Sequence, residues 1–311
     1  MTEPRYVVGG HETFAFRTSW LKKGYDAVRQ DRFAFGRDDA VVRLGVGKNM
    51  VRSIRFWCLA TRVVEEDNDP LERSSLRASK IGDRLLADSG WDPYFEDPAS
   101  LWLIHWLLVT NALRASAWWY IFARYPDNEF TKPRLNAFLQ AAISRQQQTV
   151  SPASITRDVD CFLRTYVPSE HTTATVSEAT FDCPLADLGL IRPADSDGVY
   201  RFHVGPKSGL PPHVVGYALI QFSLSHGPHR KTLGLREVLY SPGSPGQAFR
   251  LDENTLLAAL DSLSGLTNNA LEVTETAGVA QVYLKEGRKP ALEELAMGLL
   301  EDYFRSGLNE N

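Results

Sequence analysis

The feature that most constrains the fold of this chain is a basic stretch, residues 37–64, in which two helical patterns flank a glycine-containing break. Residues 38–44 are expected to form a short helix, and a longer second helix is expected to open at Asn49. Gly45 and Gly47 lie between them. Glycine tolerates the positive φ of a sharp turn, and asparagine is a preferred N-cap. Two helices joined in this way predict a helix-turn-helix.

The charge of this stretch indicates what it could contact. Between Ala40 and Val64 there is no acidic residue, and the basic residues are Arg43, Lys48, Arg52, Arg55 and Arg62. At about 100° per residue, the last three arginines fall within about 80° of one another, opposite Ile54 and Trp57. Such a helix could present its first turn to the major groove of DNA and its arginines to phosphates. The alternative is an ordinary core helix with a solvated arginine face.

The length and charge distribution predict several domains with different partners. A chain of 311 residues exceeds one ordinary domain. Residues 1–64 carry 12 Lys and Arg against 6 Asp and Glu, whereas the remainder carries 22 against 32. This division predicts a basic part that meets a polyanion on an otherwise acidic body. We expect a DNA-binding module over residues 1–90, a helical module over 91–170 and a third module over 181–311, with a polar linker at 167–180.

Other features exclude several classes of protein. Cys58, Cys161 and Cys183 have no paired spacing, and with scattered histidines they predict no zinc site. The first residues lack the apolar run of a signal peptide, which favours a cytoplasmic protein. The most hydrophobic stretch, residues 101–122, is interrupted by polar residues, so buried helices are expected and no membrane contact. Residues 241–246 lack the pattern of a phosphate-binding loop, and no organic cofactor is indicated.

The expected fold class is mainly α with small β-hairpins, an α+β protein of tandem helix-turn-helix or winged-helix modules. A strand pair and a helix within residues 71–88 would complete a winged helix around the basic stretch. Near the C-terminus, a helix capped by Asp252, a hairpin around residues 277–278 and a helix begun at Pro290 predict a second copy. Its helix, residues 253–264, is acidic and would repel DNA. We therefore expect this copy to contact protein.

Candidate catalytic residues are few, and no metal-binding set stands at a recognisable spacing. The candidates are His11, Glu12, Asp158 and Asp160. A metal-dependent nuclease brings carboxylates together around a divalent cation. Asp158 and Asp160 would point about 200° apart on a helix, so they cannot readily share a metal. For the adjacent His11 and Glu12, metal or phosphate binding is the alternative to a structural network.

Five motifs, in the same order along nearly the whole chain, resemble one known family. They are HETFAFRTSWLKKGYDAV (11–28), DDAVVRLGVGKNMVRSIRFWCLAT (38–61), DPYFEDPASLWLIHWLLVTN (92–111), ITRDVDCFLRTY (155–166) and CPLADLGLI (183–191). The family is a domain of unknown function found beside DNA phosphorothioation and related phage-defence genes. Its better-known representatives are of the SspB type, the DNA-nicking component of the single-stranded phosphorothioation system.

The resemblance implies a protein that binds double-stranded DNA and breaks one strand, so that sulfur can replace a non-bridging phosphate oxygen. It implies as partners an ATP-pyrophosphatase-like sulfur-transfer protein, an ATPase and a cysteine desulfurase. Carried onto this sequence, it makes Lys48, Asn49, Arg52 and Arg55 DNA contacts, supported by Lys22 and Lys23. We expect such a nickase to use Mg²⁺ or Mn²⁺. The alternatives are a non-catalytic DNA-binding adaptor or regulator that recruits the sulfur-transfer machinery, and a purely structural scaffold.

Overall fold

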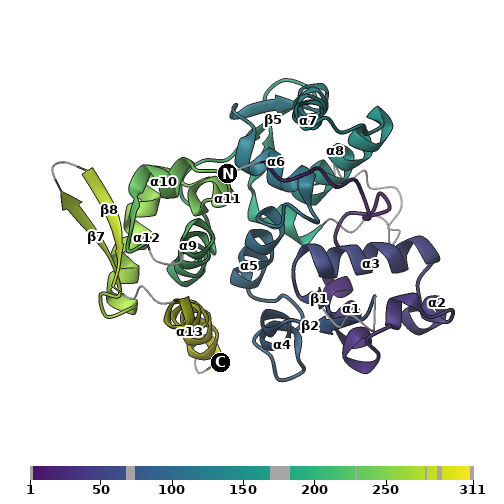
Figure 1. Cartoon of the computed structure of the whole chain (residues 1–311), viewed down its shortest axis with the longest axis horizontal. Coiled ribbons are helices and arrows are strands. Elements are labelled where there is room, and N and C mark those ends of the chain that lie inside the picture. Colours follow the sequence, from purple (N-terminus) through teal and green to yellow (C-terminus); the bar gives the residue numbers. More distant parts are fainter. Residues whose placement is uncertain are drawn as a thin grey trace. The chain divides into compact units, whose positions relative to one another are not determined.

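The computed structural model describes residues 3–67, 74–168, 183–227, 230–276, 279–285 and 289–308 (Figure 1). The chain divides by its internal contacts into unit 1, residues 1–121 and 125–202, and unit 2, residues 122–124 and 203–311. Helices with small antiparallel sheets make up both units, which confirms the α+β class. The ranges 1–90 and 91–170 lie in unit 1 except for residues 122–124, and the division into three modules stays a prediction. Nearly all of the expected linker, residues 167–180, lies outside the described residues.

Unit 1 begins with helices and one hairpin around the basic stretch. Its elements there are α1 (Thr18–Gln30), the 3₁₀ helix η1 (Ala34–Gly36), α2 (Ala40–Leu44), α3 (Lys48–Ala60), β1 (Val64–Glu66), β2 (Leu76–Ala78) and α4 (Lys80–Leu86). Helix α2 ends at Gly45, whose φ of +64° suits a residue without Cβ. The two-helix turn is therefore present, and α2 begins two residues later than expected.

The start and the end of α3 differ from the sequence-based expectation. Gly47 is its N-cap, because Gly47 already has extended backbone angles (φ −65°, ψ 159°), and Asn49 lies inside the first turn. The expectation that Asn49 caps the helix was wrong. Arg62 lies beyond the helix with φ +56°. Its guanidinium donates to the carbonyl oxygen of Thr110 at 2.9 Å, so it does not share a helix face with Arg52 and Arg55.

Helices α1 and α3 pack side by side through apolar faces (Figure 1). The buried face of α1 is made by Trp20, Leu21, Tyr25 and Val28, whose spacing is that of one side of a helix. At Gly24 the two helices approach so closely that a Cβ would lie 2.3 Å from the sulfur of Cys58. On α3 the buried residues include Ile54 and Trp57, as expected. This contact fixes which face of α3 is left for solvent.

The rest of unit 1 contains further helices and a three-stranded sheet. Its elements are α5 (Pro98–Val109), α6 (Ser116–Arg124, whose last three residues belong to unit 2), β3 (Glu129–Thr131), α7 (Lys132–Arg145), α8 (Pro152–Tyr166), the 3₁₀ helix η3 (Pro184–Leu188), β4 (Ile191–Pro193) and β5 (Val199–Phe202). Asp97, Thr131 and Ser151 cap α5, α7 and α8, because each side chain accepts a backbone N–H of the first helical turn. The sheet is antiparallel in the order β3-β5-β4.

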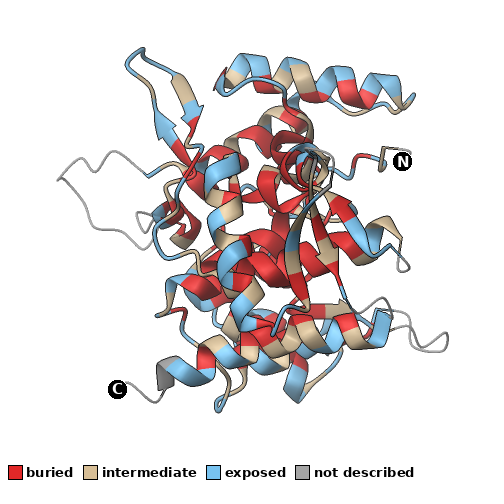
Figure 2. Ribbon diagram, turned by 90° about the vertical axis from the view of Figure 1, so that its left-hand side faces the viewer, coloured by how far each residue is buried: buried red, intermediate tan, exposed pale blue. Residues whose placement is uncertain are grey.

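Helix α5 lies in the core of unit 1, and every residue from Ala99 to Val109 is buried. Figure 2 shows the buried residues of the chain in red. The only titratable side chain of α5, His105, is fully buried and shares a 2.8 Å hydrogen bond with the hydroxyl of Tyr166 in α8. A satisfied polar group of this kind costs little in an apolar core. Among the described helices, none combines the length and the apolar character needed to cross a membrane.

Unit 2 repeats the pattern of helices around a three-stranded sheet. Its elements are α9 (Pro212–His226), β6 (Thr232–Gly234), α10 (Leu235–Tyr240), α11 (Pro245–Phe249), α12 (Glu253–Leu266), β7 (Leu271–Thr276), β8 (Val279–Leu284) and α13 (Lys289–Leu308). The cap at Asp252 is confirmed by its 2.8 Å bond from the Thr255 amide. Strands β7 and β8 form the expected hairpin, whose turn at 277–278 lies outside the described residues. The sheet order is β6-β8-β7.

Candidate functional site

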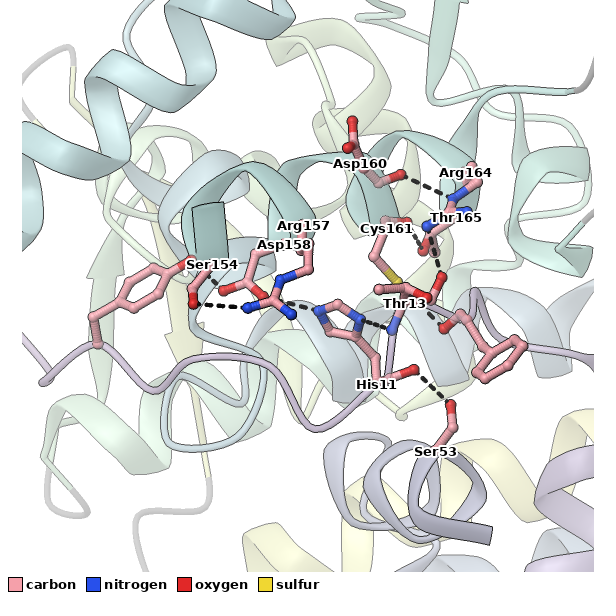
Figure 3. Close-up of polar contacts among 12 residues, drawn as sticks. His11, Thr13, Ser53, Ser154, Arg157, Asp158, Asp160, Cys161, Arg164 and Thr165 are labelled. Atoms are coloured by element: carbon pink, nitrogen blue, oxygen red, sulfur yellow. Dashed lines mark hydrogen bonds and ion pairs between the residues drawn. The ribbon is translucent and has the colours of Figure 1, made fainter. Parts of the chain in front are cut away.

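The candidate site is built on a loop, residues 9–13, that runs between α3 and α8 (Figure 3). Four of its five residues have positive φ: Gly9 (54°), Gly10 (108°), Glu12 (48°) and Thr13 (67°). Glycine takes such angles at little cost, whereas the positive φ at Glu12 and at Thr13 each costs about 1–3 kcal/mol of conformational free energy. Backbone strain of this kind persists only where the surroundings hold it, and it is frequent at functional sites.

A buried hydrogen-bond network holds this loop in place. The Nε2 atom of His11 lies 2.9 Å from Oδ1 of Asp158 in α8, and the other carboxylate oxygen accepts from the Tyr6 hydroxyl at 2.8 Å. The Nδ1 atom of His11 accepts the Thr13 amide at 3.1 Å, and the His11 carbonyl oxygen accepts from the Ser53 hydroxyl of α3 at 2.9 Å (Figure 3). The loop is therefore fixed to both helices.

The network also assigns the tautomer of the histidine. Because Nδ1 of His11 accepts an amide hydrogen, Nε2 must carry the ring proton and donate it to Asp158. Burial, followed by the neighbouring Asp158 carboxylate, raises the pKa of Tyr6 well above 10.0, so its hydroxyl remains a donor. Both ring nitrogens of His11 are thus occupied, and the histidine positions the loop.

A pocket of about 450 Å³ opens on one side of the loop, and we call it the carboxylate pocket. It is lined by Val8, Gly9, Gly10, His11, Glu12, Thr13, Asn49, Ser154, Arg157 and Asp158. Arg157 is exposed and donates to the Ser154 hydroxyl at 3.1 Å. The carboxylate pocket is lined by two carboxylates, Glu12 and Asp158, and one guanidinium, Arg157, so its lining has a net charge of −1.

A second pocket, of about 290 Å³, shares Gly9, Gly10 and Glu12 with the first, and we call it the arginine pocket. Its other lining residues are Val7, Arg52, Arg55, Phe56, Leu59 and Arg114. Arg52 lies 3.6 Å from Glu12, whereas Arg55 (3.7 Å) and Arg114 (2.6 Å) share one oxygen of Glu66. Three guanidiniums against two carboxylates leave a net charge of +1 at this rim. Partial burial of the Arg55 guanidinium lowers its pKa.

The remaining basic candidates lie elsewhere in unit 1. Lys22, Lys23 and Arg43 line a separate pocket of about 370 Å³ beside α1 and α2. Lys22 was expected to support DNA binding, but its side chain is only 12% exposed and bonds both Asp26 (2.7 Å) and Asp88 (2.8 Å). Lys23 and Arg43 have partners as well, the Leu44 carbonyl oxygen and the Asp31 carboxylate. Lys48 is exposed at the first turn of α3.

The structure separates the catalytic candidates into a group of three and a single residue. His11, Glu12 and Asp158 line the carboxylate pocket, whereas Asp160 pairs with Lys132 at 2.5 Å. Positions two apart on α8 point in different directions, as expected. Sequence reasoning did not select Arg157 or Arg114. Arg157 adjoins a candidate in the sequence, which could have drawn attention to it, whereas nothing in the sequence links Arg114 to this loop.

The described residues do not form a closed metal site, since no group of three His, Cys, Asp or Glu among them could hold an ion. Mg²⁺ usually retains several waters and needs only one or two carboxylates. Asp158 is buried with both oxygens hydrogen-bonded, so of the two carboxylates in this pocket Glu12, whose side chain is 32% exposed, is the accessible one.

The fold and this site define an α+β protein with a strained polar loop between an acidic and a cationic pocket. The chain belongs to a family of proteins of unknown function, DUF4007, whose model matches residues 8–304. It is similar to a magnesium ion-bound SspB crystal structure (TM-score 0.86) and to an SspB crystal structure (TM-score 0.85). Each of the two SspB chains is 30% identical to this chain, and the matched region covers 96% of this chain and 88% of the SspB chain. No curated protein matches. The SspB-type resemblance of the five motifs is confirmed.

Proposed function

We propose that this chain binds double-stranded DNA and breaks one strand within a phosphorothioation-based phage-defence system. The observation that supports this most is the meeting of His11, Glu12 and Asp158 in one pocket, although His11 and Asp158 lie 147 positions apart. A cationic pocket shares its wall at Glu12. In a cytoplasmic system of this kind, the partners would be the sulfur-transfer protein, the ATPase and the cysteine desulfurase.

The site residues have different roles in this proposal. The guanidiniums of Arg52, Arg55 and Arg114 bind phosphates, which carry most of the affinity for DNA. Glu12 accepts a proton or orients water at the strand to be broken. A Mg²⁺ or Mn²⁺ ion held there would supply charge stabilisation to the phosphate oxygens. Asp158 and His11 fix the loop that carries Glu12.

We also propose one winged helix in each unit, and in unit 1 we place it at residues 129–202 instead of the expected 1–90, where β1 and β2 form a sheet of two strands. The order of elements supports this. In unit 2 the strand β6 is followed by helices that include α10 and α12 and then by the hairpin β7-β8, and the sheet order is β6-β8-β7. In unit 1 the strand β3 is likewise followed by the helices α7 and α8 and then by the hairpin β4-β5, and the sheet order is β3-β5-β4. The helix before each hairpin is then the one that would enter a groove. Helix α8 has that position in unit 1, and both α8 and α3 contribute to the carboxylate pocket.

Supercoiled plasmid tests the enzymatic half of the proposal. With Mg²⁺ or Mn²⁺ the purified protein should convert plasmid to the open-circular form, and EDTA should stop the conversion. The alternative function is a non-catalytic adaptor, which is favoured by the engagement of both ring nitrogens of His11. Binding of plasmid that weakens steeply with salt, without open-circular product under any divalent metal, would select the adaptor.

Charge reversal of two arginines tests the DNA contact. The double change Arg52→Glu and Arg55→Glu should weaken binding of a short duplex by at least about tenfold and reduce the slope of log affinity against log salt by about 2, since each phosphate contact contributes about 0.9. Arg305→Glu is the matched control, because Arg305 is also an exposed arginine paired with a glutamate. Unchanged affinity in the double variant would support the structural scaffold. Fluorescence anisotropy over a salt series provides the measurement.

A further inference from the structure

The arginine pocket combines two properties that a phosphate-binding surface alone does not need. Its floor is apolar, made by Phe56 and Leu59, and its rim carries the guanidiniums of Arg52, Arg55 and Arg114. We propose that this pocket receives one nucleobase unstacked from the DNA, beside the position where the strand is broken. The inference rests on the proposed function and adds a base-reading step to it.

The chemistry of the pocket matches a flat aromatic ring with polar edges. Proteins hold unstacked bases against aromatic side chains and arginine planes, and they bond the polar edge of the base with nearby donors. A volume of about 290 Å³ lies near the lower end, about 300 Å³, of pockets that hold small molecules. Phe56 is 9% exposed, so its ring is largely fixed by the core and can serve as a rigid floor.

The charges of the two pockets indicate which part of DNA each would take. The rim of the arginine pocket has a net positive charge, which suits a nucleotide carrying its own phosphate. The carboxylate pocket has a net negative charge, which suits water and a cation. Glu12 belongs to both linings, so a base held in the first pocket would bring an adjacent phosphodiester to Glu12.

The wall that the two pockets share contains two glycines, Gly9 and Gly10. Gly10 packs against Phe56 so closely that a Cβ there would lie 2.8 Å from the ring, at a φ of +108°. Gly9 also has positive φ. Two glycines in this position let the chain pass between the pockets without side chains that would fill either one.

Binding of a matched duplex and of the same duplex with one mismatched pair tests the inference. Extruding a base costs a few kcal/mol in matched DNA and least at a mismatch, and about 1.4 kcal/mol corresponds to tenfold in affinity. We expect the mismatched duplex to bind about tenfold more tightly, and 2-aminopurine placed at the mismatch to change its emission on binding.

Two variants locate this preference in the pocket. Val7→Trp should fill the pocket and reduce the ratio of mismatched to matched affinity to within about twofold. The Val7 backbone keeps its bond to Ser116, so the position of this segment is retained. Arg114→Ala should weaken the preference without filling the space. Val273→Trp is the matched control, since Val273 in β7 is 37% exposed against 41% for Val7. Thermal unfolding confirms that each variant is folded.

The outcomes separate the inference from the function on which it rests. Equal affinity for the two duplexes, or a preference that survives in both Val7→Trp and Arg114→Ala, overturns the base pocket while DNA binding stands. Failure to bind either duplex overturns the proposed function and the pocket with it. A preference lost equally in Val273→Trp would assign the effect to the substitution and would also overturn the pocket.

Discussion

Replacing Asp158 by alanine is expected to lower the free energy of unfolding of unit 1 by about 3 kcal/mol. The change leaves the Tyr6 hydroxyl and the Nε2–H group of His11 without their acceptor, and both residues are at least 96% buried. A buried donor that loses its partner costs about 1–3 kcal/mol. Urea unfolding followed by tryptophan fluorescence measures the effect, because all seven tryptophans lie in unit 1.

Asp158→Asn is the matched variant. Its amide oxygen can accept from His11 and its amide nitrogen can donate to the Tyr6 oxygen, so both hydrogen bonds are kept while the charge is removed. We expect a loss below about 1.5 kcal/mol, as is usual when hydrogen bonding is conserved. If alanine and asparagine destabilise unit 1 equally, hydrogen bonding is not what Asp158 provides.

The variants Asp158→Ala and Asp158→Asn also test the proposed nicking activity. If the protein breaks DNA as proposed, Asp158→Ala should reduce the rate by about 100-fold, because small displacements of a catalytic group have effects of that size. Asp158 acts through the loop that carries Glu12, so Asp158→Asn should retain most of the rate. A large loss in the asparagine variant, at unchanged stability, would instead assign a direct role to the charge.

Gly246→Ala is expected to destabilise unit 2 by about 3 kcal/mol, at the upper end of the cost of overpacking. Gly246 lies in α11, where a Cβ would stand 2.4 Å from both the Cα and the carbonyl oxygen of Leu239 in α10. Backbone atoms cannot move aside as a flexible side chain can, so α10 and α11 would have to separate. Hydrogen exchange of amides in α9 and α13 measures the loss, since unit 2 has no tryptophan.

Gly298→Ala is the same substitution at an uncrowded position, and we expect it to stabilise unit 2 where Gly246→Ala destabilises it. Gly298 lies inside α13, and nothing stands within 4 Å of the Cβ position. Alanine is favoured over glycine in a helix interior by roughly 0.5–1 kcal/mol, so this variant should slow exchange in unit 2. Equal behaviour of the two glycine variants would mean that the contact between α10 and α11 does not limit the stability of the unit.

Much of the local structure could be predicted because its causes lie within a few residues. The caps at Asp97, Thr131, Ser151 and Asp252 bond amides two or three positions away, and apolar spacing marks the buried face of α1. The start of α3 was misplaced by the same kind of argument. Both Gly47 and Asn49 are acceptable caps, and the observed backbone angles select Gly47.

Charge partners could not be predicted, because they come from segments far apart in the sequence. Residues 40–64 contain no acidic residue, yet Arg52 meets Glu12, Arg55 meets Glu66, and Arg43 meets Asp31. Exposed pairs of this kind contribute little stability, about 0–1 kcal/mol, and leave guanidiniums able to exchange partners with a phosphate.

The sequence alone determined the family, the α+β class, most helix starts and the basic character of residues 37–64, because periodicity, capping and net charge are local properties. Only the tertiary structure decided that Asp158 turns toward His11 and Asp160 toward Lys132, and that Arg62 caps another helix instead of joining the basic face. Which donor meets which acceptor depends on how α3, α8 and the loop between them pack. That packing includes the contacts of Trp118 in α6 with Phe56 of α3 and Phe162 of α8.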